Sequence, residues 1–382
     1  MCATATTPAG SESAPPRRLA SHDLDSLAAL LADATGRALP SARITAGRVL
    51  RAAFAGGPGD RPWTAAALAA ARVGRWAQPT VLALSLAPCL HIVEQAVSSD
   101  GAIRVLLGAH DGELIESVLI PAPSSRIRPR TTLCVSSQVG CARACRFCES
   151  GRHGLRRQLD AAEIVDQYRL LRALWSEHPV GGEISNLVLM GMGEPFDNLP
   201  NVMRALHLLC DEHAFKVPPS HITVSTVGIA DKLALFFQST RAEIAISLNA
   251  PDDERRRMLI PVAARFDLDT LRRALLASLP ARRRVLFEYA LFDGFNDALD
   301  DADRLAEYVR PVFCRVNVIA GNPGPDPTLR SPPGERVEAF AERLRSRGVT
   351  TIIRRARGRD VGAACGQLAG AYRSRHAPAA AP

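Results

Sequence analysis

One repeating unit runs through the sequence from residue 131 to residue 354: a short apolar segment, then a longer segment whose apolar residues have helical spacing. The short segments are rich in Val, Ile and Leu, as buried strands are. The pattern predicts strands at 133–139, 186–190, 222–226, 244–248, 285–291, 315–319 and 350–353, and helices near 160–176, 200–212, 231–238, 268–279, 299–309 and 334–347. Such alternation is typical of an α/β fold with a parallel sheet, either open or closed into a barrel. Six strand–helix units are too few for a complete eight-stranded barrel.

The chain before this region has a different pattern. Residues 1–22 are rich in Pro, Ser, Thr and Ala, and we expect a disordered tail there and another at 371–382. Asp23 can cap a helix, and helical patterns follow it, so a small helical accessory domain is predicted at 23–90.

A β-hairpin is predicted at 100–122, where it would link the helical domain to the α/β region. Apolar residues alternate with others on both sides of Asp111-Gly112, a strong two-residue turn signal. Within the second arm, Glu116 shares a face with apolar residues. A carboxylate in such a place is expected to have a raised pKa, which would suit a general base. The alternative is a carboxylate at the rim of the sheet in a salt bridge.

Composition narrows the class of protein. Hydrophobic residues make up 47% of the chain and charged residues 23%, which excludes wholesale disorder. The net charge is +8, and Lys216 and Lys232 are the only lysines, so the basic surface is almost entirely arginine. Such a surface permits a nucleic-acid partner. The sequence contains no apolar run of about 18 residues and no export signal, so we expect a cytoplasmic protein without a membrane span.

The strongest chemical signal is the segment Cys141-Ala-Arg-Ala-Cys145-Arg-Phe-Cys148. Nine cysteines without an export signal favour metal ligands or catalytic thiols over disulfides. Structural zinc usually needs four ligands, whereas three closely spaced thiolates can hold three irons of a [4Fe–4S] cluster and leave the fourth iron open. An open iron can bind S-adenosylmethionine (SAM). A zinc knuckle, or three unrelated thiols, is the alternative.

Polar residues also follow several of the predicted strands. The carboxyl ends of parallel strands lie at one edge of a sheet, where ligand sites of α/β proteins assemble. Glycine allows the backbone to approach a ligand closely, and a glutamate can accept a hydrogen bond from the ammonium group of SAM. The candidate cofactor-binding residues are Gly193, Glu194, Ser225, Ser247, Leu248, Asn249 and Asn322.

Taken together, these motifs resemble the RlmN/Cfr family of radical SAM RNA methyltransferases. The likeness covers residues 113–370 and rests on motifs that occur in the family's order: Cys134-Val-Ser-Ser-Gln-Val-Gly-Cys141, Met190–Pro195, Ser225-Thr226, Ser247-Leu248, Asp293-Gly294 with Asn296-Asp297, Asn322-Pro323, and Ala364-Cys365-Gly366-Gln367-Leu368. The resemblance implies a partial (β/α)6 barrel over 131–370. It also implies that the helical domain helps to bind RNA.

The resemblance further implies a reaction and a role for each residue. Such enzymes methylate C2 or C8 of adenosine and use two molecules of SAM per turnover. Cys365 matches the residue that becomes S-methylcysteine, and Cys134 matches the thiol that releases the product through a transient disulfide. Glu116 matches the proton acceptor. Cys141, Cys145 and Cys148 match the ligands of the [4Fe–4S] cluster.

The implied partners are RNA and an electron donor such as flavodoxin or ferredoxin, and we expect a monomer. The leading hypothesis is methylation of adenosine C2 in 23S rRNA and also in tRNA. C8 methylation, another RNA, a radical SAM enzyme with a non-RNA substrate, and a zinc-containing RNA-binding protein remain alternatives. The family commonly has His where this chain has Asn249, and Asn-Pro-Phe where it has Asn322-Pro323-Gly324.

Clusters of arginine would supply the contacts to RNA phosphates. They are Arg126/Arg128/Arg130, Arg152/Arg156/Arg157, Arg255–Arg257, Arg282–Arg284 and Arg354/Arg355/Arg357/Arg359. Some of them are expected to be ordinary solvated helix faces.

Overall fold

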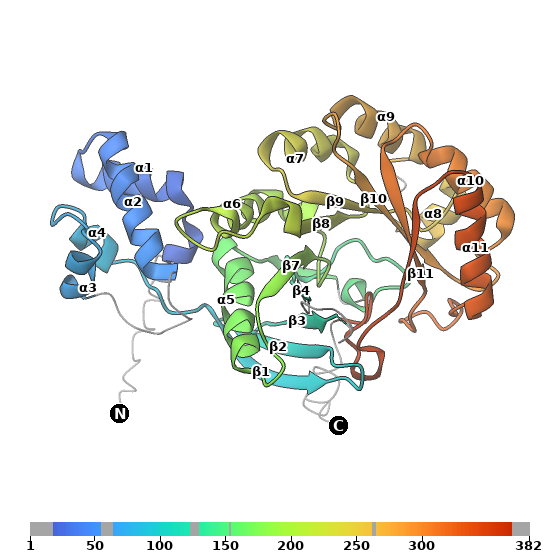
Figure 1. Ribbon diagram of the computed structural model, residues 1–382, viewed down its shortest axis with the longest axis horizontal. Helices are drawn as coiled ribbons and strands as arrows, with labels where there is room; N and C mark the ends of the chain where they lie inside the picture. Colours follow the sequence, from blue (N-terminus) through green and yellow to red (C-terminus); the bar gives the residue numbers. More distant parts are fainter. Residues whose placement is uncertain (1–17, 55–63, 123–129, 153, 262–264, 369–382) are drawn as a thin grey trace, which may run out of the picture.

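A computed structural model describes residues 18–54, 64–122, 130–152, 154–261 and 265–368. Its centre is a ten-stranded sheet with the order β1-β2-β3-β4-β7-β8-β9-β10-β11-β12. In Figure 1 these strands follow an arc, with α7, α9, α10 and α11 on its outer side. The structure confirms an α/β fold. Among the described strands β12 pairs with β11 alone, so the sheet stays open as a partial barrel.

The parallel part of the sheet begins at β4, and each later strand pairs in parallel with the one before it. The strands are β4 (Thr131–Cys134), β7 (Ile184–Leu189), β8 (Ile222–Thr226), β9 (Glu243–Ser247), β10 (Val285–Leu291), β11 (Cys314–Ala320) and β12 (Thr351–Arg354). The helices are α5 (Ala161–Glu177), α6 (Leu199–Cys210), α7 (Leu233–Ser239), α8 (Asp253–Leu259), α9 (Leu268–Ser278), α10 (Leu299–Val309) and α11 (Gly334–Ser346). All the predicted helices are present, and α8 is an addition.

The local sequence accounts for where these helices begin. Asp160 accepts a hydrogen bond from the Glu163 amide at 2.8 Å, and the Glu163 side chain accepts one from the Asp160 amide at 2.9 Å. This capping box satisfies donors that the first turn of α5 would otherwise leave free. Asp252 and Asp267 cap α8 and α9 with the first of these two bonds only, each accepting from the amide three residues later.

The predicted strand 133–139 is wrong as a single strand. β4 ends at Cys134, and β5 (Gln138–Gly140) pairs with β6 (Leu155–Gln158) in a separate two-stranded sheet. The chain leaves the main sheet because the Ser136 amide donates to the side chain of Gln167 in α5, at 2.7 Å, instead of to a neighbouring strand. This departure carries the cysteine segment over the edge of the sheet.

The hairpin belongs to the main sheet. β2 (Ile103–Ala109) and β3 (Leu114–Pro121) form it as predicted, and β3 pairs antiparallel with β4. A third strand that the sequence pattern did not reveal, β1 (Leu90–Val97), lies at the outer edge beside β2. Alternate residues of β1 are exposed, as expected for an edge strand. The hairpin predicted as a linker is therefore not a separate linker, because its two strands, together with β1, extend the main sheet.

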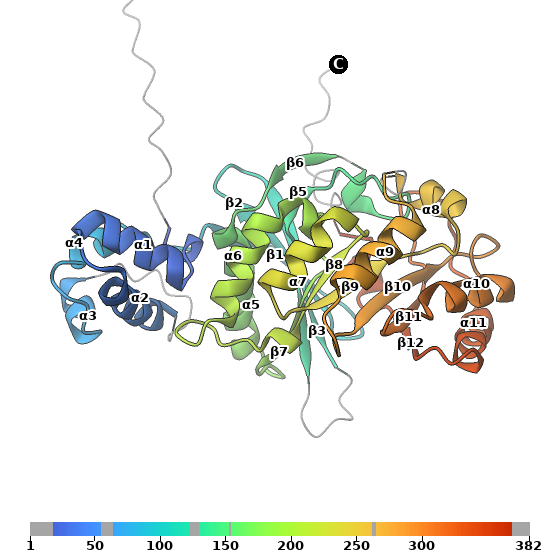
Figure 2. The same ribbon diagram turned by 90° about the horizontal axis from the view of Figure 1, so that it is seen from above.

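The amino-terminal helices lie beside α5 and α6, away from the barrel interior (Figures 1 and 2). They are α1 (Leu24–Thr35), α2 (Leu39–Phe54), α3 (Ala65–Ala70) and α4 (Gln78–Leu82). Asp23 caps α1 as predicted, accepting from the Ser26 amide at 2.8 Å.

The expected disordered tail 1–22 is wrong at its end, because Leu19 is fully buried in a short 3-10 helix, Leu19–Ser21. Residues 1–17 of that tail and the expected tail 371–382 lie outside the described residues. None of the helices in the described ranges is both long enough and apolar enough to cross a membrane.

Candidate active site

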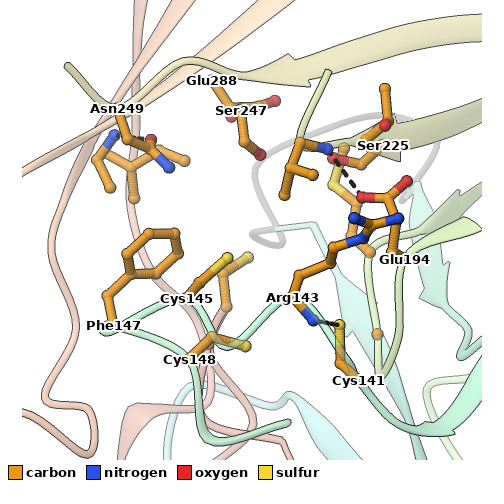
Figure 3. A pocket seen from close by; sticks show the side chains of 18 of the residues that line it. Cys141, Arg143, Cys145, Phe147, Cys148, Glu194, Ser225, Ser247, Asn249 and Glu288 are labelled. Carbon is orange, nitrogen blue, oxygen red and sulfur yellow. Dashed lines mark hydrogen bonds between the residues drawn. The ribbon is translucent and has the colours of Figure 1, made fainter. Parts of the chain in front are cut away.

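A cavity opens at the carboxyl ends of the parallel strands. Its wall brings together residues far apart in the sequence, including all three cysteines of the cluster motif. Figure 3 shows these thiols on one side of the cavity, with Ser247 and Glu288 opposite and Glu194 between the two sides. Of the predicted residues, the cavity is lined by Cys141, Cys145, Cys148, Gly193, Glu194, Ser225, Ser247, Asn249, Asn322 and Cys365. Leu248 is fully buried and is not among the described residues that line it.

The three cysteines are suited to holding a metal cluster. Burial, with a contribution from neighbouring thiols, raises the pKa of Cys141 to about 12 and raises the pKa of Cys145 and Cys148 as well. Binding to iron would stabilise the thiolates that burial disfavours. Among the described residues, no three His, Cys, Asp or Glu side chains are arranged to hold a single ion. A [4Fe–4S] cluster does not require that arrangement, because each thiolate binds a different iron.

The segment Met190–Pro195 is fixed against the strand that leads to the cysteines. The Ser137 amide donates to the Met192 carbonyl at 2.8 Å, and the Glu194 amide donates to the Gln138 side chain at 2.7 Å. Gly193 has φ +101°, and a Cβ there would lie 2.8 Å from the Gln138 amide nitrogen. Only glycine fits this close approach.

Glu194 is a buried carboxylate with both oxygens held in place. Oε1 accepts from the Phe196 amide at 2.9 Å, and Oε2 accepts from the Val227 amide at 2.8 Å. Burial raises the pKa of Glu194 to about 7, against the opposing effect of these hydrogen bonds. The carboxylate thus faces the cavity with both oxygens anchored by backbone amides. The guanidinium of Arg143, which lines the same cavity, is paired with Asp197, so Glu194 can still receive an ammonium group.

Asn249 and Asn322 both line the cavity, and the side-chain oxygen of Asn249 and both polar atoms of Asn322 are already hydrogen-bonded within the fold. The Asn249 side chain accepts from the Ala290 amide at 2.9 Å, and its backbone has φ +57°, a conformation that Asn tolerates well. Asn322 donates to the Cys365 carbonyl at 3.0 Å and accepts from Arg359 Nε at 2.7 Å. In the structure Asn322 therefore positions the segment that carries Cys365.

A second cavity adjoins the first and contains both of the remaining predicted thiols. Cys134 is buried at the end of β4, whereas Cys365 is exposed and lines both cavities. Burial raises the pKa of Cys134 to about 12, and the neighbouring Cys365 thiol adds to the effect. Both cysteines are free thiols in this structure. Cys365 thus lies between the cluster cysteines and Cys134.

The segment that carries Cys365 is bonded directly to the cluster loop. The Glu149 amide donates to the Gly366 carbonyl at 2.8 Å, and the Ser150 hydroxyl donates to the Leu368 carbonyl at 2.8 Å. A Cβ at Gly366 would lie 2.8 Å from the Phe147 carbonyl oxygen, and one at Gly324 would lie 2.7 Å from the same atom. The backbone of this chain therefore leaves no room for a side chain at Gly324, where the family commonly has Phe.

Comparisons with known proteins agree with this site. A model described as the Radical SAM superfamily matches residues 135–309. A probable RNA methyltransferase of Sorangium cellulosum is 59% identical over 360 residues, which cover 94% of this chain and 89% of that protein. A protein of Syntrophobacter fumaroxidans named dual-specificity RNA methyltransferase RlmN is 41% identical, over 74% of this chain and 81% of that protein. This chain belongs to the RlmN family of radical SAM RNA methyltransferases.

A solved structure supports the same assignment. The crystal structure of a radical SAM methyltransferase from Sphaerobacter thermophilus has a TM-score of 0.77 and 34% sequence identity, and the match covers 92% of this chain and 99% of that one. Membership of this family makes the protein a SAM-dependent RNA methyltransferase and implies a [4Fe–4S] cluster.

Glu116 has an environment different from that of the other predicted residues in this RlmN-family enzyme. It is buried on β3 and accepts from Arg104 Nη1 at 3.0 Å. It is not among the described residues that line the two cavities. In the antiparallel pairing of β3 with β4, however, Val118 lies opposite Cys134. Glu116 precedes Val118 by two residues and therefore lies on the same face of the sheet as Val118 and Cys134. The salt bridge considered for it exists, but in the interior and not at the rim.

Two residues of the site had not been predicted to line it: Glu288 had no predicted role, and Arg354 was expected only as a contact to RNA phosphates. Glu288 lines the first cavity, and its Oε1 accepts from Asn317 Nδ2 at 2.8 Å and from Arg354 Nη1 at 3.4 Å. Arg354 lines both cavities. The available signal was a carboxylate in the apolar strand Val285–Leu291, the same signal that singled out Glu116.

Most of the arginines proposed as RNA contacts have partners within the enzyme. Ion pairs within the fold involve Arg152, Arg156, Arg157 and Arg255, whereas Arg256 and Arg283 donate to backbone carbonyls. Arg126 and Arg128 lie outside the described residues. Arg355 is exposed at the second cavity and has no hydrogen bond or ion pair within the described part of the chain, which leaves it available to a phosphate.

The raised pKa of Glu194 predicts a pH-dependent affinity for the cofactor. The ionised carboxylate binds an ammonium group, and the ionised fraction rises as the pH passes 7. The affinity for S-adenosylhomocysteine, a probe that does not react, should therefore rise about tenfold from pH 6 to pH 8 in anaerobic calorimetry. Glu194→Gln should bind it more weakly and lose this part of the pH dependence. Equal pH profiles for the two proteins would contradict the role of Glu194.

Proposed function

We propose that this protein methylates C2 of an adenosine in 23S rRNA, and also in tRNA, through an S-methylcysteine on Cys365. The single observation that carries the proposal is the place of Cys365, between the cluster cysteines and Cys134 and on the wall of both cavities. An adenine C2 carbon is not a nucleophile, so a methyl group cannot simply be passed to it from a sulfonium. A thiol that first takes up the methyl group, next to a radical-generating site, supplies what such a carbon requires.

The residues divide the work between the two cavities. Cys141, Cys145 and Cys148 would hold the cluster, and Glu194 would bind the ammonium group of SAM. When bound, the cluster supplies the electron that cleaves SAM reductively. The name of the Syntrophobacter relative, a dual-specificity RNA methyltransferase, supports RNA as the substrate.

In the second cavity, Cys365 carries the one-carbon unit to the base. The Cys134 thiolate then attacks the Cys365 sulfur and forms a disulfide with it. The bond between that sulfur and the transferred carbon breaks, and the carbon keeps the electron pair and takes up a proton to become the methyl group of the product. Two molecules of SAM are consumed per turnover, one to methylate Cys365 and one to start the transfer. An external donor such as flavodoxin or ferredoxin supplies the electron, and we propose a cytoplasmic monomer.

The test is anaerobic reconstitution with labelled SAM and total RNA from a strain that lacks the gene, followed by nucleoside analysis. We expect label in 2-methyladenosine from 23S rRNA and tRNA. Label in 8-methyladenosine, which liquid chromatography separates from 2-methyladenosine, would show that the enzyme methylates C8 and not C2. Absence of labelled methyladenosine, with SAM still cleaved, would show a substrate other than RNA adenosine.

Glu116 is proposed as the acceptor of the proton that leaves the adenine carbon. Glu116→Gln keeps the size of the side chain and an oxygen for Arg104. The variant should lose activity by about 10²- to 10⁴-fold, the usual contribution of a general base. Its melting temperature should also fall, because the buried ion pair with Arg104 loses its negative charge. The measurement is the initial rate of methylation together with thermal unfolding. Activity above a tenth of the wild-type rate would make Glu116 simply the partner of Arg104.

A further inference from the structure

The second cavity has a largely apolar wall, and its charged side chains are all of one sign. Much of its wall is apolar, with Ile120, Val188, Met190, Ile319 and Leu368 among the lining residues. Its charged side chains are all guanidinium groups, from Arg354, Arg355 and Arg357. No carboxylate is among the described side chains that line it. A flat, apolar ligand whose edge presents hydrogen-bond acceptors would complement these walls.

Arg354 is the one of these three arginines that lines both cavities. Its Nη1 donates to Glu288 Oε1 at 3.4 Å, and Asn317 holds the same oxygen at 2.8 Å. Its Nε and Nη2 have no hydrogen bond within the described residues, and 34% of the side chain is exposed. The Glu288–Asn317 pair therefore fixes one corner of the guanidinium and leaves two donor atoms free.

We propose that Arg354 recognises the target base by donating a hydrogen bond to a ring nitrogen next to the carbon that is methylated. This inference rests on the proposed function, which requires the carbon to lie next to Cys365 and Cys365 to be within reach of Cys134. Both thiols line the second cavity, and so does Arg354. The two neighbours of adenine C2 are N1 and N3, which carry no hydrogen and accept hydrogen bonds.

The same contact would contribute to base specificity. In guanine N1 carries a hydrogen and C2 carries an amino group, so a guanidinium placed to donate to adenine N1 would face donors of guanine. Two facing donors leave both groups unsatisfied, which disfavours the wrong base. A hydrogen bond from a charged donor at a buried site corresponds to about 10- to 100-fold in binding or rate.

The test must distinguish contact between Arg354 and the base from a second possible role of Arg354, an effect on the Cys134 thiol. The positive charge of Arg354 also lowers the pKa of the Cys134 thiol, against the larger effect of burial. Arg354 could thus act on the thiol alone, without contact to the base. If Arg354 acted only on the thiol, replacing it would slow the reaction equally on adenosine and on analogues that lack a ring nitrogen.

The experiment uses the reconstituted enzyme and synthetic RNA with the sequence around the adenosine that the wild type methylates. The target is adenosine, 1-deazaadenosine or 3-deazaadenosine, and single-turnover rates are compared. The wild type should be about 10- to 100-fold slower on at least one analogue. Arg354→Met should be slowed to a similar degree on adenosine and should show no further loss, below about twofold, on that analogue.

The matched control is Arg355→Met, the adjacent arginine at the same cavity. It should keep the wild-type ratio between adenosine and the analogue, whatever its effect on RNA affinity. Iron content and melting temperature confirm that each variant is folded and loaded. If Arg354→Met is not folded and loaded with iron, Glu288→Gln is the second variant. It removes the charge that holds Arg354 Nη1, and it should reduce the ratio of the rate on adenosine to the rate on the analogue.

Two results would overturn the inference. One is a wild-type enzyme equally fast on adenosine and both analogues, and the other is an Arg354→Met enzyme that keeps the full discrimination and so acts on the thiol alone. A wild type that methylates no RNA adenosine is a different failure, because it shows in the first arm before any variant is compared. That result would remove the proposed function and this inference with it.

Discussion

Replacing Cys365 by alanine should reduce RNA methylation by at least about 10³-fold and leave the cluster in place. No other described thiol lines both cavities, so nothing can take over the methyl group. The cluster should survive because Cys365 is tied to the cluster loop through neighbouring backbone atoms, at Gly366 and Leu368, and not through its side chain. The measurement is methyladenosine formed per enzyme, with iron content determined on the same sample.

The control for this variant is Cys314→Ala. Cys314 is a half-buried thiol on β11 and is not among the described residues that line the two cavities, so its loss should leave the rate within about twofold. Methylation by Cys365→Ala at more than a tenth of the wild-type rate would exclude Cys365 as the methyl carrier. The enzyme would then have to use a different route to the same product.

The second large effect concerns the cluster. Cys148→Ala should lower bound iron to less than a tenth of the wild-type content after anaerobic reconstitution, and methylation should fall by at least about 10³-fold. Two thiolates cannot hold the cluster as three do, and the remaining raised pKa values of Cys141 and Cys145 favour the neutral thiols without metal. Iron and sulfide assays and visible absorption provide the measurement.

Cys210→Ala is the control, because Cys210 lies on α6 and burial alone raises the pKa of its thiol to about 11. It should keep its iron and colour. A wild-type protein that contains zinc, and neither iron nor sulfide, after anaerobic purification would contradict the cluster. It would favour the zinc-containing RNA-binding protein that the sequence left open.

The strand–helix order could be predicted from the sequence because each element carries its own periodicity. The edge strand Leu90–Val97 could not, since its exposed residues break the apolar pattern and its pairing with β2 is long-range information. The same reason applies to the end of β4. Its position is decided by Gln167, a residue more than thirty positions away, which takes the Ser136 amide.

That Cys141, Cys145, Cys148 and Glu194 lie together at one cavity could be predicted, because closely spaced motifs specify them. The roles of Asn322 and Glu288 could not, since both depend on contacts between distant segments. Asn322 looked like a cofactor ligand at a strand end, but its amide bonds to Cys365 and Arg359. Glu288 had the same sequence signal as Glu116, and only the fold shows that one of these two carboxylates faces a cavity.

The two hydrogen bonds from Glu149 and Ser150 to residues 366 and 368 also bear on how the enzyme is made. On the ribosome the cluster cysteines emerge long before Cys365 does. A nascent chain at that stage lacks the closing segment, so its iron site has one open wall. We therefore expect iron and sulfide to be inserted after residue 368 has been synthesised, when the carboxyl-terminal segment can close over the cluster loop.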